Sequence, residues 1–106
     1  MRVAVGPGDD LAALVRAADA GSVLVLIDPA LGPLAMARAR ASIGPLAIER
    51  APGVRVNALV AAGDADAADV EAAAQFLEAA RSTTGQLLEV AARRRVHGPS
   101  RSSTKA

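Results

Sequence analysis

Hydrophobic residues follow two different patterns along this chain, and the two patterns alternate. Short aliphatic runs without internal polar alternation are typical of strands that are buried on both faces of a sheet. Segment 22–28 shows this pattern, segment 1–5 is a short apolar run that fits a strand, and segments 53–60 and 86–92 are the remaining expected strands. The three segments between them are helical in spacing or composition: 11–20, 29–51 and 67–80. The pattern therefore predicts four strands separated by three helices.

This alternation also predicts the fold class. Strands that alternate with helices form βαβ units, which build a parallel sheet with helices on both faces. We expect an α/β fold over residues 1–92, a truncated Rossmann-like domain whose four-stranded, mostly parallel sheet is flanked by helices. A parallel sheet that lacks its central strands should leave a strand edge exposed, along 1–5 or 22–28.

The ends and faces of the helices carry further signals. Asp9 or Asp10 should cap the first helix and Gly21 should end it. Its apolar face should consist of Leu11, Leu14, Val15 and Ala18. In the second helical segment Pro33 suits a first turn, whereas Pro45 should kink or split the helix. The third helix should bury Val70, Ala73, Ala74 and Leu77.

Composition limits the core and the available chemistry. Hydrophobic residues make up 52% of the 106-residue chain, yet Phe76 is its only aromatic residue. The apolar content is mainly Ala, Val and Leu, so we expect a light core that a subunit partner would help to stabilise. The absence of Cys excludes disulfides and thiolate chemistry. No stretch approaches the roughly 18 apolar residues of a membrane span, and a cytoplasmic protein is the default expectation.

Charge is distributed unevenly along the chain. Residues 93–106 carry five basic residues and no acid, whereas residues 1–92 hold seven basic against eleven acidic residues, a net charge of −4. We expect 93–106 to be a disordered basic tail, in which the only His, His97, is solvated. The tail has no aromatic side chain to stack on a base, so a solubilising or partner-seeking role is favoured over nucleic-acid binding.

Two motifs in the second half of the chain resemble one known family. The segments "LAIERAPGVRVNALVAAG" (46–63) and "DAADVEAAAQFLEAARSTTGQLLEV" (66–90) are similar, in order and spacing, to the final strands and helices of the short-chain dehydrogenase/reductase (SDR) family. The similarity extends more weakly to residue 22 and is loose over 1–20. The resemblance implies the back half of a Rossmann-like enzyme that transfers hydride with a nicotinamide cofactor.

The residue types that the family needs for catalysis are missing from this chain. The resemblance implies a Tyr as general acid/base, a Lys four residues later, a Ser on the preceding strand and an Asn on an earlier helix. The Tyr and Lys positions fall at about Gly32 and Met36, and the Ser position falls near Asp28 and Pro29. The chain has no Tyr, its only Lys is in the tail, and its only Asn lies in the "RVN" segment. We therefore expect no catalytic residue.

Candidate cofactor residues are weak. The family's glycine-rich turn places backbone N–H groups on a pyrophosphate, but here only Gly6 and Gly8 follow the first strand. The two aspartates directly after them would repel phosphate, which favours a tight turn and a helix cap. Gly63 matches the Gly of the family's Pro-Gly pair, with Ala62 in place of the Pro. We expect no bound cofactor, and NAD(P) only if a partner chain completes the site.

Several other polar residues admit a structural and a functional interpretation. Asp28 stands where open α/β sheets place ligand groups, but capping of the next helix is favoured. Three further aspartates, Asp64, Asp66 and Asp69, are better explained as a solvated loop and a cap than as a metal site.

Two functions of different class follow from these observations. The first is a degenerate SDR-like protein without catalysis of its own, acting as an oligomerisation or regulatory subunit that pairs with itself or with a full-length SDR. The resemblance implies interfaces at 11–20, 33–50, 67–80 and 86–92. The second is an NAD(P)-linked oxidoreductase component that borrows its Tyr, Lys and cofactor site from a partner chain. A gene remnant without function is a third interpretation, which the intact core pattern opposes.

Overall fold

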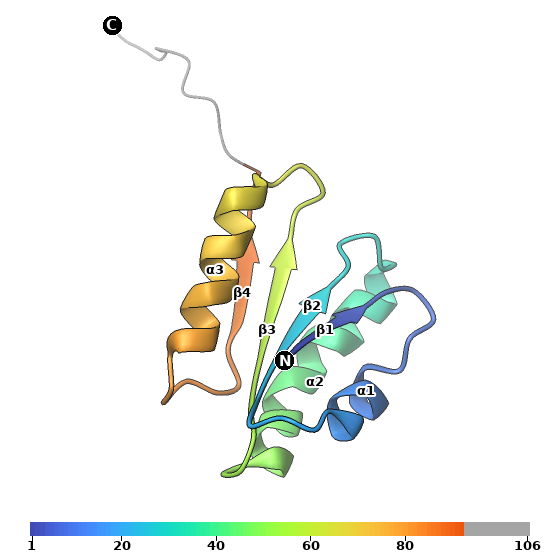
Figure 1. Cartoon of the computed structure of the whole chain (residues 1–106). Helices are drawn as coiled ribbons and strands as arrows, with labels where there is room; N and C mark the ends of the chain where they lie inside the picture. Colours follow the sequence, from blue (N-terminus) through green and yellow to red (C-terminus); the bar gives the residue numbers. More distant parts are fainter. Residues whose placement is uncertain (93–106) are drawn as a thin grey trace, which may run out of the picture.

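A computed structural model of the chain describes residues 1–92, which form one α/β unit. The elements are β1 (Arg2–Val5), α1 (Leu11–Ala17), β2 (Ser22–Ile27), α2 (Pro33–Arg50), β3 (Arg55–Ala61), α3 (Ala67–Ala79) and β4 (Leu87–Val90). The strands form a single sheet in the order β1-β2-β3-β4, and every neighbouring pair is parallel (Figure 1). The predicted order of elements and the α/β fold class are confirmed. The basic tail and His97 lie outside the described residues.

The three helices are divided between the two faces of the sheet (Figure 1). Helices α1 and α2 pack on one face and α3 packs on the other, as the two separate core clusters require. Each connection leads to the next strand in the same direction across the parallel sheet. Because α3 covers the opposite face from α1 and α2, the crossover through α3 has the opposite handedness to the two before it, and the three cannot all follow the usual right-handed rule.

Each face of the sheet has its own hydrophobic core. The larger core joins α1 and α2 to the sheet and contains the fully buried Val15, Val23, Val25, Val56 and Ala58. The smaller core lies under α3 and consists of Leu24, Leu59, Ala74 and Leu77, with Val70 and Ala73 packed against it. The predicted inner face of α3 is thereby confirmed. Neither core contains an aromatic residue, in agreement with the light core expected from composition.

Helix α2 corrects the prediction that Pro45 would kink or split this segment. The helix runs without a break from Pro33, which occupies its first turn as predicted, to Arg50. Proline lacks an N–H group, so the carbonyl of Ala41 has no intrahelical donor. Ala41 is exposed to water, while Ile43 and Leu46 on either side of the proline are buried against the sheet. Packing on both sides of Pro45 therefore keeps the helix continuous.

The first helix is shorter than predicted. It ends at Ala17 rather than at Gly21, because Ala18 adopts an extended conformation and packs its methyl group into the core. Leu14 was expected on the buried face but is 37% exposed. The prediction of an aspartate cap is confirmed for Asp10, whose Oδ1 accepts a hydrogen bond from the Ala13 N–H at 3.1 Å.

β1 and β4 are the two edge strands of the sheet, and β1 is one of the two segments predicted to leave an open edge. Segment 22–28 is not an edge, because β2 pairs with β1 on one side and with β3 on the other. Arg2 of β1 reaches α3 on its face of the sheet and forms ion pairs with Glu71 at 2.7 Å and Glu78 at 2.8 Å. Within residues 1–92, no helix is both long and apolar enough to cross a membrane.

Candidate functional site

Three consecutive residues of β3, Arg55 to Asn57, hold the loop that connects α3 to β4. The Arg55 guanidinium donates to the carbonyl of Ala80 at 2.8 Å, just beyond the last turn of α3. Positive charge at this place also stabilises the negative end of the helix dipole. The backbone of Val56 donates to Thr84 Oγ1 at 3.0 Å and accepts from the Gly85 N–H at 2.7 Å. The loop is therefore attached to the sheet before β4 begins.

Asn57 completes this attachment from inside the protein. It is only 2% exposed, and it is the only polar side chain buried in the part of the chain that the structure describes. Its Nδ2 group donates to the Thr83 carbonyl at 2.9 Å, and its Oδ1 accepts from the Gln86 N–H at 3.0 Å. The sequence signal for this role was a single polar residue within an aliphatic strand. The sequence places this residue in the "RVN" segment but does not reveal its partners.

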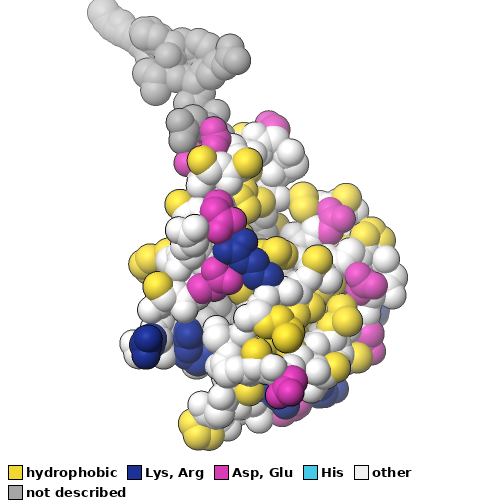
Figure 2. Space-filling view, viewed as in Figure 1, with side chains coloured by type: hydrophobic (Ala, Val, Ile, Leu, Met, Phe, Trp, Pro, Cys, Tyr) yellow, Lys and Arg dark blue, Asp and Glu magenta, His cyan; other side chains and the backbone are white. Residues whose placement is uncertain are grey.

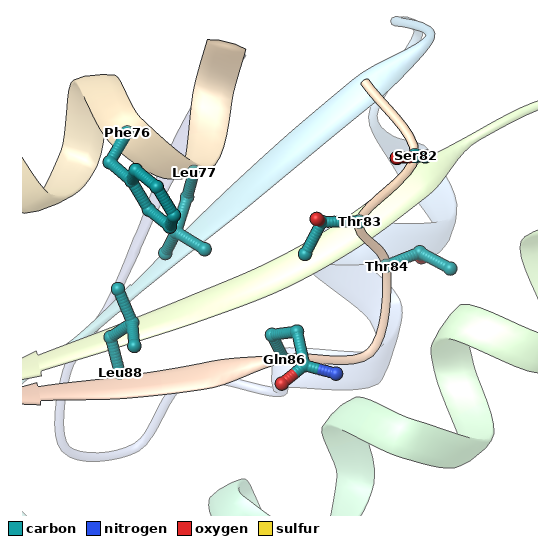
Figure 3. Close-up of a pocket in the computed structure, with 7 residues that line it drawn as sticks. All are labelled: Phe76, Leu77, Ser82, Thr83, Thr84, Gln86 and Leu88. Atoms are coloured by element: carbon teal, nitrogen blue, oxygen red, sulfur yellow. The ribbon is translucent and has the colours of Figure 1, made fainter. Parts of the chain in front are cut away.

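The anchored loop forms one wall of a hollow of about 340 Å³ on the α3 side of the sheet (Figure 3). The hollow is lined by Phe76, Leu77, Ser82, Thr83, Thr84, Gln86 and Leu88. The Phe76 ring lies beside Leu77, and the side chains of Thr83 and Thr84 point to opposite sides of the loop (Figure 3). Phe76 is 64% exposed, so the only aromatic residue of the chain lies on the surface rather than in the core.

The glycine loop after β1 forms a self-contained turn. The Gly6 N–H donates to Asp9 Oδ2 at 2.8 Å, and the Asp9 N–H donates to the Gly6 carbonyl at 3.1 Å. Gly8 has a φ of 85°, a left-handed conformation that favours glycine. Asp10 then caps α1, which has only seven residues. A pyrophosphate needs free N–H groups, whereas the Gly6 N–H is already bonded to the Asp9 carboxylate, which would itself repel a phosphate.

The positions that correspond to the family's catalytic residues lie between β2 and the first turn of α2. Gly32 is the N-cap residue of α2, without a side chain to cap it, and Met36 packs partly buried against the larger core. Asp28 was expected to cap α2, but its Oδ1 accepts from the Ala30 N–H at 2.8 Å and holds the turn that precedes the helix. The helix starts five residues after Asp28, too far along the chain for that carboxylate to cap it.

The remaining candidates follow β3. Gly63 lies exposed in the turn after the strand, and nothing lies within 4 Å of the position that a Cβ atom would take there. Asp66 caps α3 by accepting from the Ala68 N–H at 2.8 Å, and Asp69 lies in the first turn of that helix. Over residues 1–92 no group of three or more His, Cys, Asp or Glu side chains is placed to hold a metal ion.

Helices α1 and α2 form an outer surface that combines charge pairs with exposed apolar side chains. Arg16 of α1 donates to both carboxylate oxygens of Glu49 of α2 at 2.8 Å, and this hydrogen bonding lowers the pKa of Glu49. A hollow of about 480 Å³ next to this ion pair is lined largely by Ala12, Ala41, Pro45 and Leu46. At either end of α2, Leu34 is 65% exposed and Ile48 is 78% exposed.

Comparison with known proteins gives one match. A family model described as short chain dehydrogenase-like protein matches residues 5–90 of the 106-residue chain. Searches of curated proteins and of solved structures each returned no match. The matched range includes all three helices and both motifs that carried the resemblance in sequence.

Proposed function

The chain belongs to the short chain dehydrogenase-like family. We propose that it acts as a non-catalytic oligomerisation or regulatory subunit, which pairs with itself or with a full-length dehydrogenase. One observation carries the proposal. Helix α2 keeps exposed apolar side chains, whereas the positions on it that correspond to catalytic residues hold Gly32 and Met36. Neither side chain can exchange a proton, so this helix is better suited to contact than to chemistry.

The exposed side chains of α2 support contact with another protein. Leu34 and Ile48 lie about four turns apart along an 18-residue helix, with the hollow beside α1 between them. Large side chains that are exposed around a shallow apolar hollow are typical of protein–protein interaction sites. The core has little area per residue, and burial of this surface against a partner would add to its stability.

The opposite face of the sheet offers a second contact surface. Phe76 is exposed on α3 next to a hollow whose walls are held in place by Asn57 and Arg55. Exposed aromatic residues at preformed hollows are frequent anchors of protein interfaces. The chain therefore has one candidate contact surface on each face, which would allow it to join two partners or to extend an oligomer.

Co-purification tests this proposal. The tagged chain is co-expressed with full-length dehydrogenases of the same genome, and the mass of the purified product is measured by light scattering. We expect a defined homo-oligomer or a complex with a full-length relative. Ile48→Glu and Phe76→Glu should each weaken assembly, whereas Ala67→Glu adds the same charge at the start of α3 and should not. A strictly monomeric chain that captures no full-length relative would refute the proposal.

The alternative function is an NAD(P)-linked oxidoreductase component whose Tyr, Lys and cofactor site come from a partner chain. The observation that favours it is a hollow of about 590 Å³ between the glycine loop and α2, lined by Gly6, Gly8 and Arg38 among others. Titration of NADH and NADPH against the purified chain, and against any complex that it forms with a full-length dehydrogenase, separates the two proposals. Micromolar binding by the chain itself, or activity of the complex that is lost without the chain, would support the alternative, whereas the absence of both results would leave the non-catalytic function.

The location of the protein in the cytoplasm remains a prediction. Cell fractionation with an antibody against the chain would check it.

A further inference from the structure

The outer edge of β1 carries backbone groups that no strand pairs within the described residues. β1 is the first strand in the sheet order, and its register aligns Arg2 with Leu24 and Ala4 with Leu26. The N–H groups of Leu24 and Asp28 donate to the carbonyls of Met1 and Val5 at 2.8 and 3.0 Å. In this ladder the odd-numbered residues of β1 bond to β2. The N–H and carbonyl groups of Arg2 and Ala4 therefore point away from the sheet.

This edge has few of the features that prevent strand addition. Proteins protect edge strands by keeping them very short or with lysine, proline, bulges or covering loops; β1 is short, with four residues, but none of the residues "RVAV" is lysine or proline. The one charged side chain, Arg2, is drawn back over the face of the sheet, where its Nε and both terminal nitrogens bond to Glu71 and Glu78. Ala4 is exposed and too small to obstruct a neighbouring strand.

Figure 2, which has the same view as Figure 1, shows basic side chains between acidic ones, with hydrophobic side chains beside them. Two charged groups are relevant at the edge. At the start of β1 the N-terminal amine donates to the Ser22 carbonyl, and just after the end of β1 the Asp9 carboxylate accepts a hydrogen bond from the Gly6 N–H. One end of the strand is therefore positive and the other is negative.

We propose that β1 pairs antiparallel with β1 of a second copy of this chain, about a two-fold axis at Val3. In this register the outward N–H and carbonyl groups of Arg2 face those of Ala4 in the second copy, and the groups of Ala4 face those of Arg2 in the second copy. Each of the two residue pairs forms two backbone hydrogen bonds, which gives four in total. The amine of each copy approaches the Asp9 end of the other. A parallel arrangement would bring like charges together at both ends, and a two-fold axis satisfies the symmetry that most homo-oligomers adopt.

The paired copies form a continuous eight-stranded sheet with α1 and α2 of both copies on one face and both α3 helices on the other. The proposal uses a different part of the surface from the assembly function proposed above. The edge of β1 contains none of the exposed residues of α2 or α3 that were assigned to that function. Self-pairing and assembly through the helices can therefore succeed or fail separately.

Proline substitution at the edge is the first test. Ala4→Pro removes an outward N–H from each copy without removing a bond to β2, a position at which edge strands accept proline. Ala4→Ser keeps the N–H and is the matched control. By light scattering and sedimentation, Ala4→Pro should weaken self-association about thirtyfold, and Ala4→Ser should leave it unchanged. A wild-type chain that stays monomeric at 100 µM, or a folded Ala4→Pro variant that associates like wild type, would overturn the proposal.

Disulfide trapping gives a second measurement, which does not depend on the proline variant folding. The chain has no cysteine, so one introduced thiol yields one defined product. Val3→Cys should form an intermolecular disulfide, because directly opposed residues at a non-hydrogen-bonded position lie within the Cα separation that disulfides require. Ile48→Cys on α2 is the control. Cross-linking at residue 3 supports the edge pair. Cross-linking at residue 48 alone, or a complex that forms only with a full-length dehydrogenase, would overturn it while leaving the assembly function intact.

Discussion

The buried amide of Asn57 gives the sharpest test of how this fold is held together. Asn57→Ala removes two hydrogen bonds and leaves the Thr83 carbonyl and the Gln86 N–H without a partner. A buried polar group that loses its partner costs about 1–3 kcal/mol, so we expect the variant to lose about 2–4 kcal/mol of unfolding free energy. A domain of this size has about 5–14 kcal/mol in total. The melting temperature should fall by roughly 8–30 °C.

Urea unfolding followed by circular dichroism measures this loss. The slope of the unfolding free energy against urea concentration should be the same as in the wild type, because the surface exposed on unfolding is nearly unchanged. Asn57→Leu is the decisive control, since leucine fills about the same volume but cannot form hydrogen bonds. If the lost hydrogen bonds are responsible, Asn57→Leu will be about as unstable as Asn57→Ala. A leucine variant within about 1 kcal/mol of wild type would show that the alanine cost comes from a cavity, and would refute the reasoning.

Three further predictions concern other contacts. Hydrogen bonds from Arg2, and secondarily from a neighbouring glutamine, lower the pKa of Glu71 to about 2. Because this pKa is lowered in the folded state, the stability that it contributes is present above the unfolded pKa of about 4.5 and is lost as the pH falls towards 2. Arg2→Ala should therefore differ from wild type in acid denaturation at pH 6 and converge with it near pH 2; a constant difference would contradict the assignment. Thr84→Val should cost about 1–2 kcal/mol in urea unfolding, because the Val56 N–H loses its acceptor, while Thr84→Ser should be close to wild type. Pro45→Ala should stabilise the protein by about 1–3 kcal/mol by restoring a donor within α2, and a loss of stability would show that the proline ring is needed for packing.

The order of the elements could be predicted because the strands are mainly aliphatic runs, and residues that favour turns, such as glycine, proline and aspartate, separate them from the helices. The continuous α2 could not, because the effect of Pro45 depends on how firmly Ile43 and Leu46 are packed against a sheet that the local sequence does not reveal. Local rules describe the cost of a proline in a helix, and tertiary packing decides whether that cost breaks it.

The candidate site was predictable only by exclusion. The absence of Tyr and the place of the single Lys are readable from composition alone. The attachment of the α3–β4 loop to β3 was not, because Asn57 and its acceptor at Thr83 are far apart in the sequence and meet only once β4 pairs with β3. The ion pairs of Arg2 with α3 have the same origin, since they require the sheet order and the face on which α3 lies.

The strand order of this sheet has a consequence for how the chain folds during synthesis. Each strand pairs with the one that was made immediately before it, so no strand has to wait for a later segment to be inserted between it and its neighbour. The sheet can therefore grow one βαβ unit at a time as the chain leaves the ribosome, and its contact order stays moderate for an all-parallel sheet. Only the ion pairs of Arg2 with α3 join the first strand to the last helix, and they would form at the end of this process.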